Sequence, residues 1–170
     1  GEVDLAIASS IPQGFAGDAL TTVRFIAAAA PGHPLHRLGR EITLDDLREH
    51  RHLIVRDSGS QPAAPAAPRV SDRRWTVTSK ATSIRAACMG LGFAWYAEDL
   101  IRRELDEGTL VPLPLKTGRE RFATLYLIFA DADAAGPGAR RLAERIRESI
   151  GALKRGERRY TDDSVTKRLT

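Results

Sequence analysis

The sequence predicts an α/β protein made of two lobes that are joined by two crossing strands. The segment Ala86–Leu115 reads as the end of a helix, a short apolar strand, an amphipathic helix and a second short strand. This alternation is typical of a parallel α/β layer. Two long apolar segments, Leu20–Ala30 and Phe122–Ala130, bracket the middle of the chain. We therefore expect the chain to pass between the lobes in these two strands.

The first half of the chain contains three strand candidates and one short helix. The strands are apolar and end at polar or proline-containing loops; they are Val3–Ala8, Leu20–Ala30 and His52–Val55. Thr43 is a suitable N-cap for a helix over Leu44–Glu49, whose first turn carries two aspartates. The prolines of Gln61–Pro68 recur every three residues and exclude a regular helix, so we expect an extended loop there.

The second half alternates strands with amphipathic helices. The expected elements are a strand at Trp75–Thr78, a helix from the N-cap Ser79 to Met89, a strand at Phe93–Tyr96, a helix at Glu98–Glu107, and strands at Leu110–Leu113 and Phe122–Ala130. A last helix, Ala139–Ile150, places Leu142, Ala143, Ile146 and Ile150 on one face. Strand alternation puts Phe93 and Trp95 on one face of their strand and Ala94 and Tyr96 on the other.

Composition indicates an ordinary globular chain, with 42% hydrophobic and 28% charged residues. The net charge of +4 is concentrated after Leu153, where the basic residues Lys154, Arg155, Arg158, Arg159, Lys167 and Arg168 outnumber the acidic ones. The body is thus nearly neutral and lacks the basic surface of a nucleic-acid domain. The single Cys88 excludes an internal disulfide and fits a reducing compartment. No apolar run reaches the roughly 18 residues of a membrane helix, and no signal peptide is visible.

Four sequence motifs follow one another along most of the chain. They are Gly1-Glu2-Val3-Asp4-Leu5-Ala6-Ile7, His33-Pro34-Leu35, Ile42-Thr43-Leu44-Asp45-Asp46-Leu47, and Gly90-Leu91-Gly92-Phe93 followed by Glu104-Leu105, Gly108, Leu110-Val111 and Leu113. In this order and at these spacings they resemble the effector-binding domain of LysR-type transcriptional regulators. The order makes the match specific, although each motif alone is weak. Trp95-Tyr96-Ala97 departs from the family, which more often has aliphatic residues and a proline there.

The resemblance implies a fold like the type II periplasmic binding proteins, with an effector cleft between two lobes. Residues 1–28 and 131–153 would form an incomplete lobe I, residues 29–130 lobe II with the crossover strands, and residues 154–170 a basic, disordered tail. The match begins partway through lobe I, so the family's N-terminal helix-turn-helix domain, its linker helix and the first strand–helix units of that lobe are expected to be missing.

The same resemblance implies a function and partners. It predicts a cytoplasmic, ligand-sensing domain that is not an enzyme, needs no cofactor and binds a small anionic metabolite to modulate transcription. It further implies a homodimer or tetramer, no membrane association, and contact with DNA only through the helix-turn-helix domain. Two alternatives share the scaffold. A solute-binding protein of a transporter would carry a cleavable signal in the full gene, and an enzyme would need an acid–base pair in the cleft, for which no candidate is visible.

The expected ligand contacts come from loops at strand ends, where ligands bind in open α/β sheets. The candidates are Ser10, the Arg56, Ser58, Gly59 and Ser60 loop, Thr78, Ser79 and Phe93. Arg56 can pair with a carboxylate, and Ser79 would present a helix N-terminus to an anion. The alternatives stay open: a solvated turn at Arg56, a plain helix cap at Ser79, an ordinary loop at Ser10 and a core aromatic at Phe93.

The sequence gives little support for a metal site, a nucleophilic cysteine or a dinucleotide-binding loop. The spacing of His33, His36, His50 and His52 matches no zinc motif, and the one cysteine is remote. Cys88 falls in a helical apolar pattern and is expected to be a buried structural thiol. Gly90-Leu91-Gly92 lacks the third glycine of a dinucleotide loop and follows a helix instead of a strand.

Overall fold

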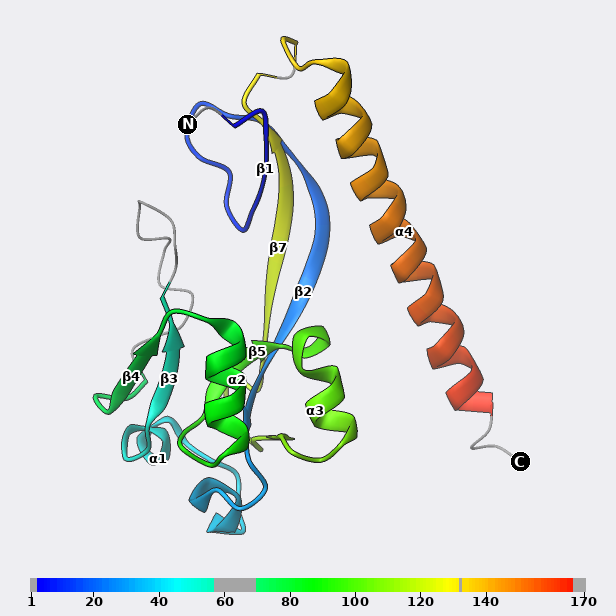
Figure 1. Cartoon of the computed structure of the whole chain (residues 1–170). Coiled ribbons are helices and arrows are strands. Elements are labelled where there is room, and N and C mark those ends of the chain that lie inside the picture. The colour runs from blue at the N-terminus through cyan, green and yellow to red at the C-terminus, as the bar shows by residue number, and fades with distance from the viewer. Residues whose placement is uncertain (1–2, 57–69, 132, 167–170) are drawn as a thin grey trace. The chain divides into compact units, whose positions relative to one another are not determined.

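The computed structural model describes residues 3–56, 70–131 and 133–166, with side chains described up to Leu153. The contacts divide the chain into two compact units. Unit 1 comprises Gly1–Val23 and Ala123–Thr170, and unit 2 comprises Arg24–Phe122. Both boundaries fall inside long strands, β2 (Gly17–Ala29) and β7 (Glu120–Phe129). The two predicted crossing strands are therefore confirmed (Figure 1).

Unit 1 consists of β1 (Leu5–Ala8), one part each of β2 and β7, and the helix α4 (Pro137–Thr166). β1 pairs antiparallel with β7, with Leu5 opposite Phe129. Its core joins Leu20 and Leu127 to Ala143 of α4, with Ile146 and Ile150 packed beside them. The Arg147 Nη2 atom lies 2.7 Å from Asp18 Oδ2, which links α4 to β2 on the surface.

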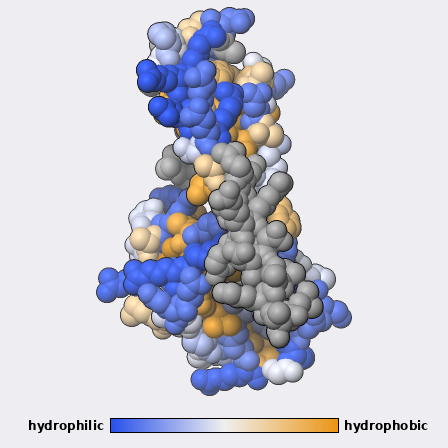
Figure 2. All heavy atoms as spheres, turned by 90° about the vertical axis from the view of Figure 1, so that its right-hand side faces the viewer, coloured by the Kyte–Doolittle hydropathy of each residue, from blue (hydrophilic) through white to orange (hydrophobic). Residues whose placement is uncertain are grey.

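Helix α4 differs from its prediction in two respects. It continues through Gly151 to Thr166 instead of ending near Ile150. Leu142, predicted on the buried face, is 54% exposed, because the buried stripe runs through Ala143, Ile146 and Ile150. The described outer side of α4 is largely hydrophilic (Figure 2), as expected for charged residues such as Arg141, Glu144 and Glu148.

The rest of β2 is the central strand of unit 2. It pairs antiparallel with β5 (Ala94–Ala97) and with β6 (Val111–Pro112), with Ala28 opposite both Ala94 and Pro112. β5 and β6 therefore run in the same direction on either side of β2. A parallel layer was predicted within Ala86–Leu115, but β5 and β6 do not pair with each other, because each pairs with β2. Parallel pairing instead joins β3 (His52–Val55) to β4 (Arg74–Val77), and a parallel bridge joins His52 to Phe93 just before β5.

The helices of unit 2 are short and begin close to their predicted positions. α1 (Leu44–Arg48) has Thr43 as its cap, and Thr43 and Asp46 form a reciprocal capping box. α2 (Lys80–Cys88) follows Ser79 and lies against β3 and β4 (Figure 1). The predicted helix Glu98–Glu107 is a 3-10 turn, η2 (Glu98–Ile101), followed by α3 (Arg102–Asp106). A 3-10 turn η1 (Pro34–Leu38) follows β2.

Two core clusters lie in unit 2, and the residues of β2 alternate between them. Ile26 and Ala28 join Leu53, Ala94 and Tyr96 in the first core cluster. Ala27 and Ala29 join Phe93 in the second, with Trp95 packed against it. The predicted division of Phe93 and Trp95 from Ala94 and Tyr96 is thus confirmed. Cys88 is a half-buried free thiol packed against the first core cluster.

Gly92 occupies a position where β5 begins against the chain that leads into β3. A Cβ atom at this residue would lie 2.5 Å from the Arg51 carbonyl oxygen and 3.1 Å from Leu53 Cγ. The backbone there is fixed, because the Phe93 amide donates to that same oxygen at 3.0 Å. A side chain at position 92 must therefore push these two segments apart.

We expect Gly92→Ala to lower the free energy of unfolding by about 1–3 kcal/mol, the usual cost of overpacking. Chemical denaturation of the full chain measures this. Gly32→Ala is the matched control, because nothing lies within 4 Å of a Cβ built at Gly32. Equal stability of the two variants would show that the approach of Arg51 to Gly92 is not close.

Candidate functional site

The structure brings Arg56 and Thr78 together at one edge of unit 2. They follow the parallel strands β3 and β4 directly, and the Arg56 amide donates to the Val77 carbonyl oxygen at 2.8 Å. Arg56, Thr78 and Ser79 are all exposed. Ser79 occupies the N-cap position of α2, but its hydroxyl makes no capping hydrogen bond. A cation, two hydroxyls and a helix N-terminus are thus available to an anion at this edge.

The other predicted contacts have different positions. Ser58, Gly59 and Ser60 lie outside the described residues. Ser10 is exposed in unit 1, after β1. Phe93 is completely buried and packs in the second core cluster. The ligand roles of these residues stay predictions.

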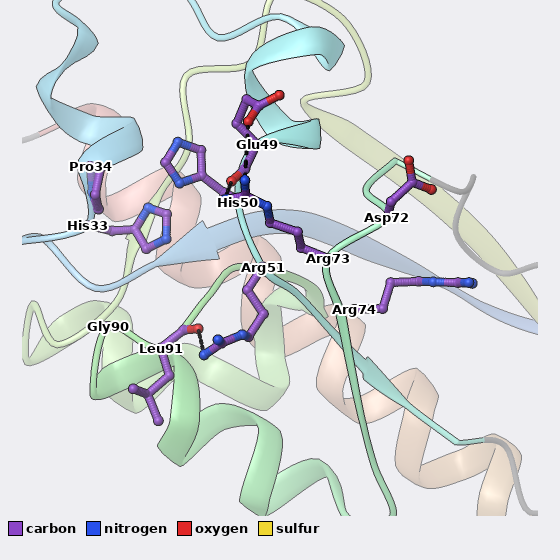
Figure 3. Close-up of a pocket in the computed structure, with 10 residues that line it drawn as sticks. All are labelled: His33, Pro34, Glu49, His50, Arg51, Asp72, Arg73, Arg74, Gly90 and Leu91. Carbon is purple, nitrogen blue, oxygen red and sulfur yellow. Dashed lines mark hydrogen bonds and ion pairs between the residues drawn. The ribbon is translucent and has the colours of Figure 1, made fainter.

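An open pocket of about 510 Å³ lies at the opposite ends of β3 and β4, where both strands begin (Figure 3). Its lining mixes charges of both signs, because Glu49 and Asp72 accompany the arginines 51, 73 and 74. Arg73 donates to the Glu49 carbonyl oxygen at 2.8 Å, and Arg51 lies 5.9 Å above the Trp75 ring. The pocket is therefore polar without favouring one sign of charge, and it was not predicted from the sequence.

Two histidines at this pocket have structural explanations. His33 is the N-cap of η1, where its Nδ1 accepts from the Leu35 amide at 3.3 Å. Its ring lies edge-on to that of His50, with centroids 5.1 Å apart. Among the residues that the structure describes, no three His, Cys, Asp or Glu side chains are grouped so that they could hold a metal ion.

A cluster of aromatic and cationic side chains lies on the side of β5 that carries Trp95. The Arg121 guanidinium lies 4.1 Å from the centroid of the Trp95 ring. His52 is stacked on Phe93, with centroids 5.2 Å apart and planes 9° from parallel, and meets Trp95 edge-on at 5.4 Å. The sequence indicated the shared face of Phe93 and Trp95, but it gave no signal that Arg121 and His52 meet them.

The electrostatics of this cluster follow from its burial. Burial, together with the positive charges of Arg121 and Arg74, lowers the pKa of His52 to about 4. Burial likewise lowers the pKa of Arg121 from its usual value. The buried atoms His52 Nδ1 and Arg121 Nη1 have no hydrogen-bond partner. A buried polar group without a partner costs about 1–3 kcal/mol, and a charged one costs more.

Arg24 has the opposite environment on the other face of the same strands. Its guanidinium forms ion pairs with Glu98, at 2.7 Å, and with Glu120. These partners raise its pKa, chiefly through the hydrogen bond that Arg24 donates to Glu120. Because successive side chains of a strand alternate, Glu120 faces Arg24 while Arg121 faces Trp95. Arg24 is thus neutralised, whereas no ion pair of Arg121 is found in the part of the chain that the structure describes.

The fold defines a class of protein before any sequence comparison. Two α/β units joined by two crossing strands are the architecture of type II periplasmic-binding-protein-like domains. The model of the LysR substrate binding domain matches residues 1–151, and the chain belongs to this family. A comparison with curated proteins finds no match.

Solved structures of regulatory proteins share the fold. The CrgA regulatory domain from Neisseria meningitidis is 20% identical, with a TM-score of 0.64 over 87% of this chain and 76% of that one. The Synechocystis CcmR regulatory domain, solved in complex with 2-PG, is 15% identical, with a TM-score of 0.66 over 88% and 74%. Full-length AphB from Vibrio cholerae is 14% identical, with a TM-score of 0.62 over 86% of this chain and 52% of that one. At these identities the likeness concerns the fold alone.

The described helices include none with the length and apolar character needed to cross a membrane.

The match of the family model confirms that the resemblance to LysR-type regulators reflects family membership, and the fold class expected from the resemblance is confirmed as well. The family is one of regulatory domains of transcription factors.

The two buried histidines predict how stability depends on pH. Burial, and then His50 and His36, lower the pKa of His33 to about 4, as for His52. In the unfolded chain both imidazoles have a pKa near 6.5, so the unfolded state binds more protons between these values. The free energy of unfolding therefore falls as the pH drops from about 6.5 to about 4, by roughly 2–3 kcal/mol for each histidine.

His33→Asn tests the contribution of His33 to the pH dependence of the free energy of unfolding. Asparagine is a good N-cap and does not titrate in this range. We expect the variant to lose less stability than the parent chain between pH 6.5 and pH 4, with similar stability at pH 7.5. Urea unfolding at each pH measures it. Parallel pH profiles for both proteins would show that His33 is not held neutral in the folded chain.

Proposed function

We propose that this chain is the ligand-sensing domain of a LysR-type transcription factor and that it binds a small anionic metabolite. The family match over residues 1–151 carries the proposal. The exposed Arg56, Thr78 and Ser79 support the choice of an anion. An arginine fork pairs with a carboxylate or phosphate through two parallel hydrogen bonds, and hydroxyl groups add further donors. The CcmR regulatory domain, which has a similar fold, was solved with 2-PG bound.

The proposed mechanism is a shift between conformations. A ligand that binds one arrangement of the regulatory domain more tightly increases the population of that arrangement, in proportion to its difference in affinity. In the full-length protein the change would reach DNA through the helix-turn-helix domain and the geometry of a homodimer or tetramer. We further propose that the protein works in the cytoplasm and has no catalytic activity. The cleft and the lobe boundaries expected from the sequence (1–28 with 131–153, and 29–130) stay predictions.

A thermal-shift screen of the chain against organic acids and amino acids tests the function, because a ligand that binds the folded state raises the melting temperature. For a carboxylate that binds, we expect Arg56→Ala to weaken affinity about 10-fold to 100-fold and Ser79→Ala about 3-fold to 10-fold, the values of one charged and one neutral hydrogen bond. Isothermal titration calorimetry measures both.

The control is Arg48→Ala, which removes an exposed arginine of α1 whose partner is Asp45. It should bind as the parent chain does. Unchanged affinity in both loop variants would remove these loops from the site, and the absence of any stabilising compound in the screen would count against ligand sensing itself.

A further inference from the structure

Arg121 lies at the start of β7 with its guanidinium against an aromatic ring. Its carbon Cζ is 4.1 Å from the centroid of Trp95, and the side chain is half-buried. The buried Nη1 atom makes no hydrogen bond, and no described carboxylate pairs with the residue. The acid next to it in sequence is engaged elsewhere, since Glu120 pairs with Arg24.

A second polar group without a partner lies beside the same ring. His52 is 3% exposed, and its Nδ1 has no hydrogen-bond partner. Its ring is fixed by stacking on Phe93 and by an edge contact with Trp95. Arg121 and His52 thus lie beside Trp95, and each has a buried nitrogen without the hydrogen-bond partner that buried polar groups normally have.

The position of the Arg121 guanidinium over the Trp95 ring indicates which kind of ligand would pair with it. A guanidinium that lies over an aromatic ring uses its flat face, so the N–H groups along its edge stay free. That edge has the spacing of a carboxylate and binds it through two parallel hydrogen bonds. The ring beside the guanidinium gives the site an apolar side, because it belongs to Trp95. An anion with an apolar body satisfies both features, whereas a neutral polar molecule leaves the cation unpaired.

We propose that Arg121 binds the carboxylate of the effector and that the effector is a small monocarboxylic acid whose apolar body lies against Trp95. This inference rests on the proposed function. It assigns the carboxylate to a residue of a crossing strand in place of the loop residue Arg56, because the Trp95 ring meets His52 at the start of β3 whereas Arg56 follows the end of that strand. His52 is a positioning residue, because its ring holds Trp95 under the guanidinium.

Benzoate and its neutral analogue benzamide are the probes. The full chain carrying Trp75→Phe keeps Trp95 as its single tryptophan, so Trp95 fluorescence reports binding next to Arg121. We expect benzoate to change this emission and to bind at least about 10-fold more tightly than benzamide. Arg121→Met should weaken benzoate binding at least about 10-fold, and Arg121→Lys should weaken it less, because it keeps the charge and loses the fork.

The control is Arg119→Met, which removes a side chain 57% exposed that pairs with Glu41 at 3.6 Å. It should bind benzoate as the parent chain does. Circular dichroism and the melting temperature report whether Arg121→Met is folded; if it is not, Arg121→Lys decides. Equal binding of benzoate and benzamide, or benzoate affinity in the folded Arg121 variants equal to that of Arg119→Met, would overturn the inference.

Failure of benzoate to bind the parent chain also overturns the proposed effector class. The thermal-shift screen then separates the two proposals. If another compound raises the melting temperature, ligand sensing stands and the role assigned to Arg121 is wrong. If no compound does, the proposed function fails as well.

Discussion

The burial of β2 on both faces is the constraint on which unit 2 depends. Ala27, Ala28 and Ala29 are 0–1% exposed, and they alternate between the two core clusters. Small side chains let β5 and β6 pair on either side of the strand while larger residues such as Phe93 and Leu53 fill the clusters. Each fully buried large apolar side chain contributes about 1.5–3 kcal/mol. Larger residues in place of these alanines would overpack both clusters at once.

The alternation of side chains along β2 and β7 also decides which arginine side chains form ion pairs and which do not. β2 and β7 are neighbouring strands, so residues on one face of the pair meet acids and residues on the other meet aromatic rings. Arg24 lies between Glu98 and Glu120, and surface pairs of this kind contribute little to stability. Arg121 lies against Trp95 and has no anion beside it in the described chain. The contrast between two arginines of adjacent strands is what makes Arg121 the stronger candidate for ligand recognition.

The predictions from sequence succeeded where a local signal exists. Thr43 caps α1 as predicted, and β3 has the predicted bounds His52–Val55. The predictions failed for helix α4, where they relied on the apolar pattern of the whole helix. The helix continues past Gly151, and Leu142 lies outside its buried stripe. At the candidate site, Arg56 and Thr78 meet as expected from parallel strand ends, whereas the pocket in Figure 3 and the neighbours of Arg121 had no sequence signal.

The sequence by itself determined the family, the α/β class and the two crossing strands, because apolar periodicity, caps and ordered motifs are local properties of the chain. Tertiary structure alone decided which polar groups meet. Arg121 and Trp95 are far apart in sequence, as are Arg24 and Glu98, and their contacts depend on strand register across β2, β5 and β7. Register places a side chain on one face or the other, so a shift of β7 by one residue would turn Arg121 to the face of Arg24 and Glu120 to the face of Trp95.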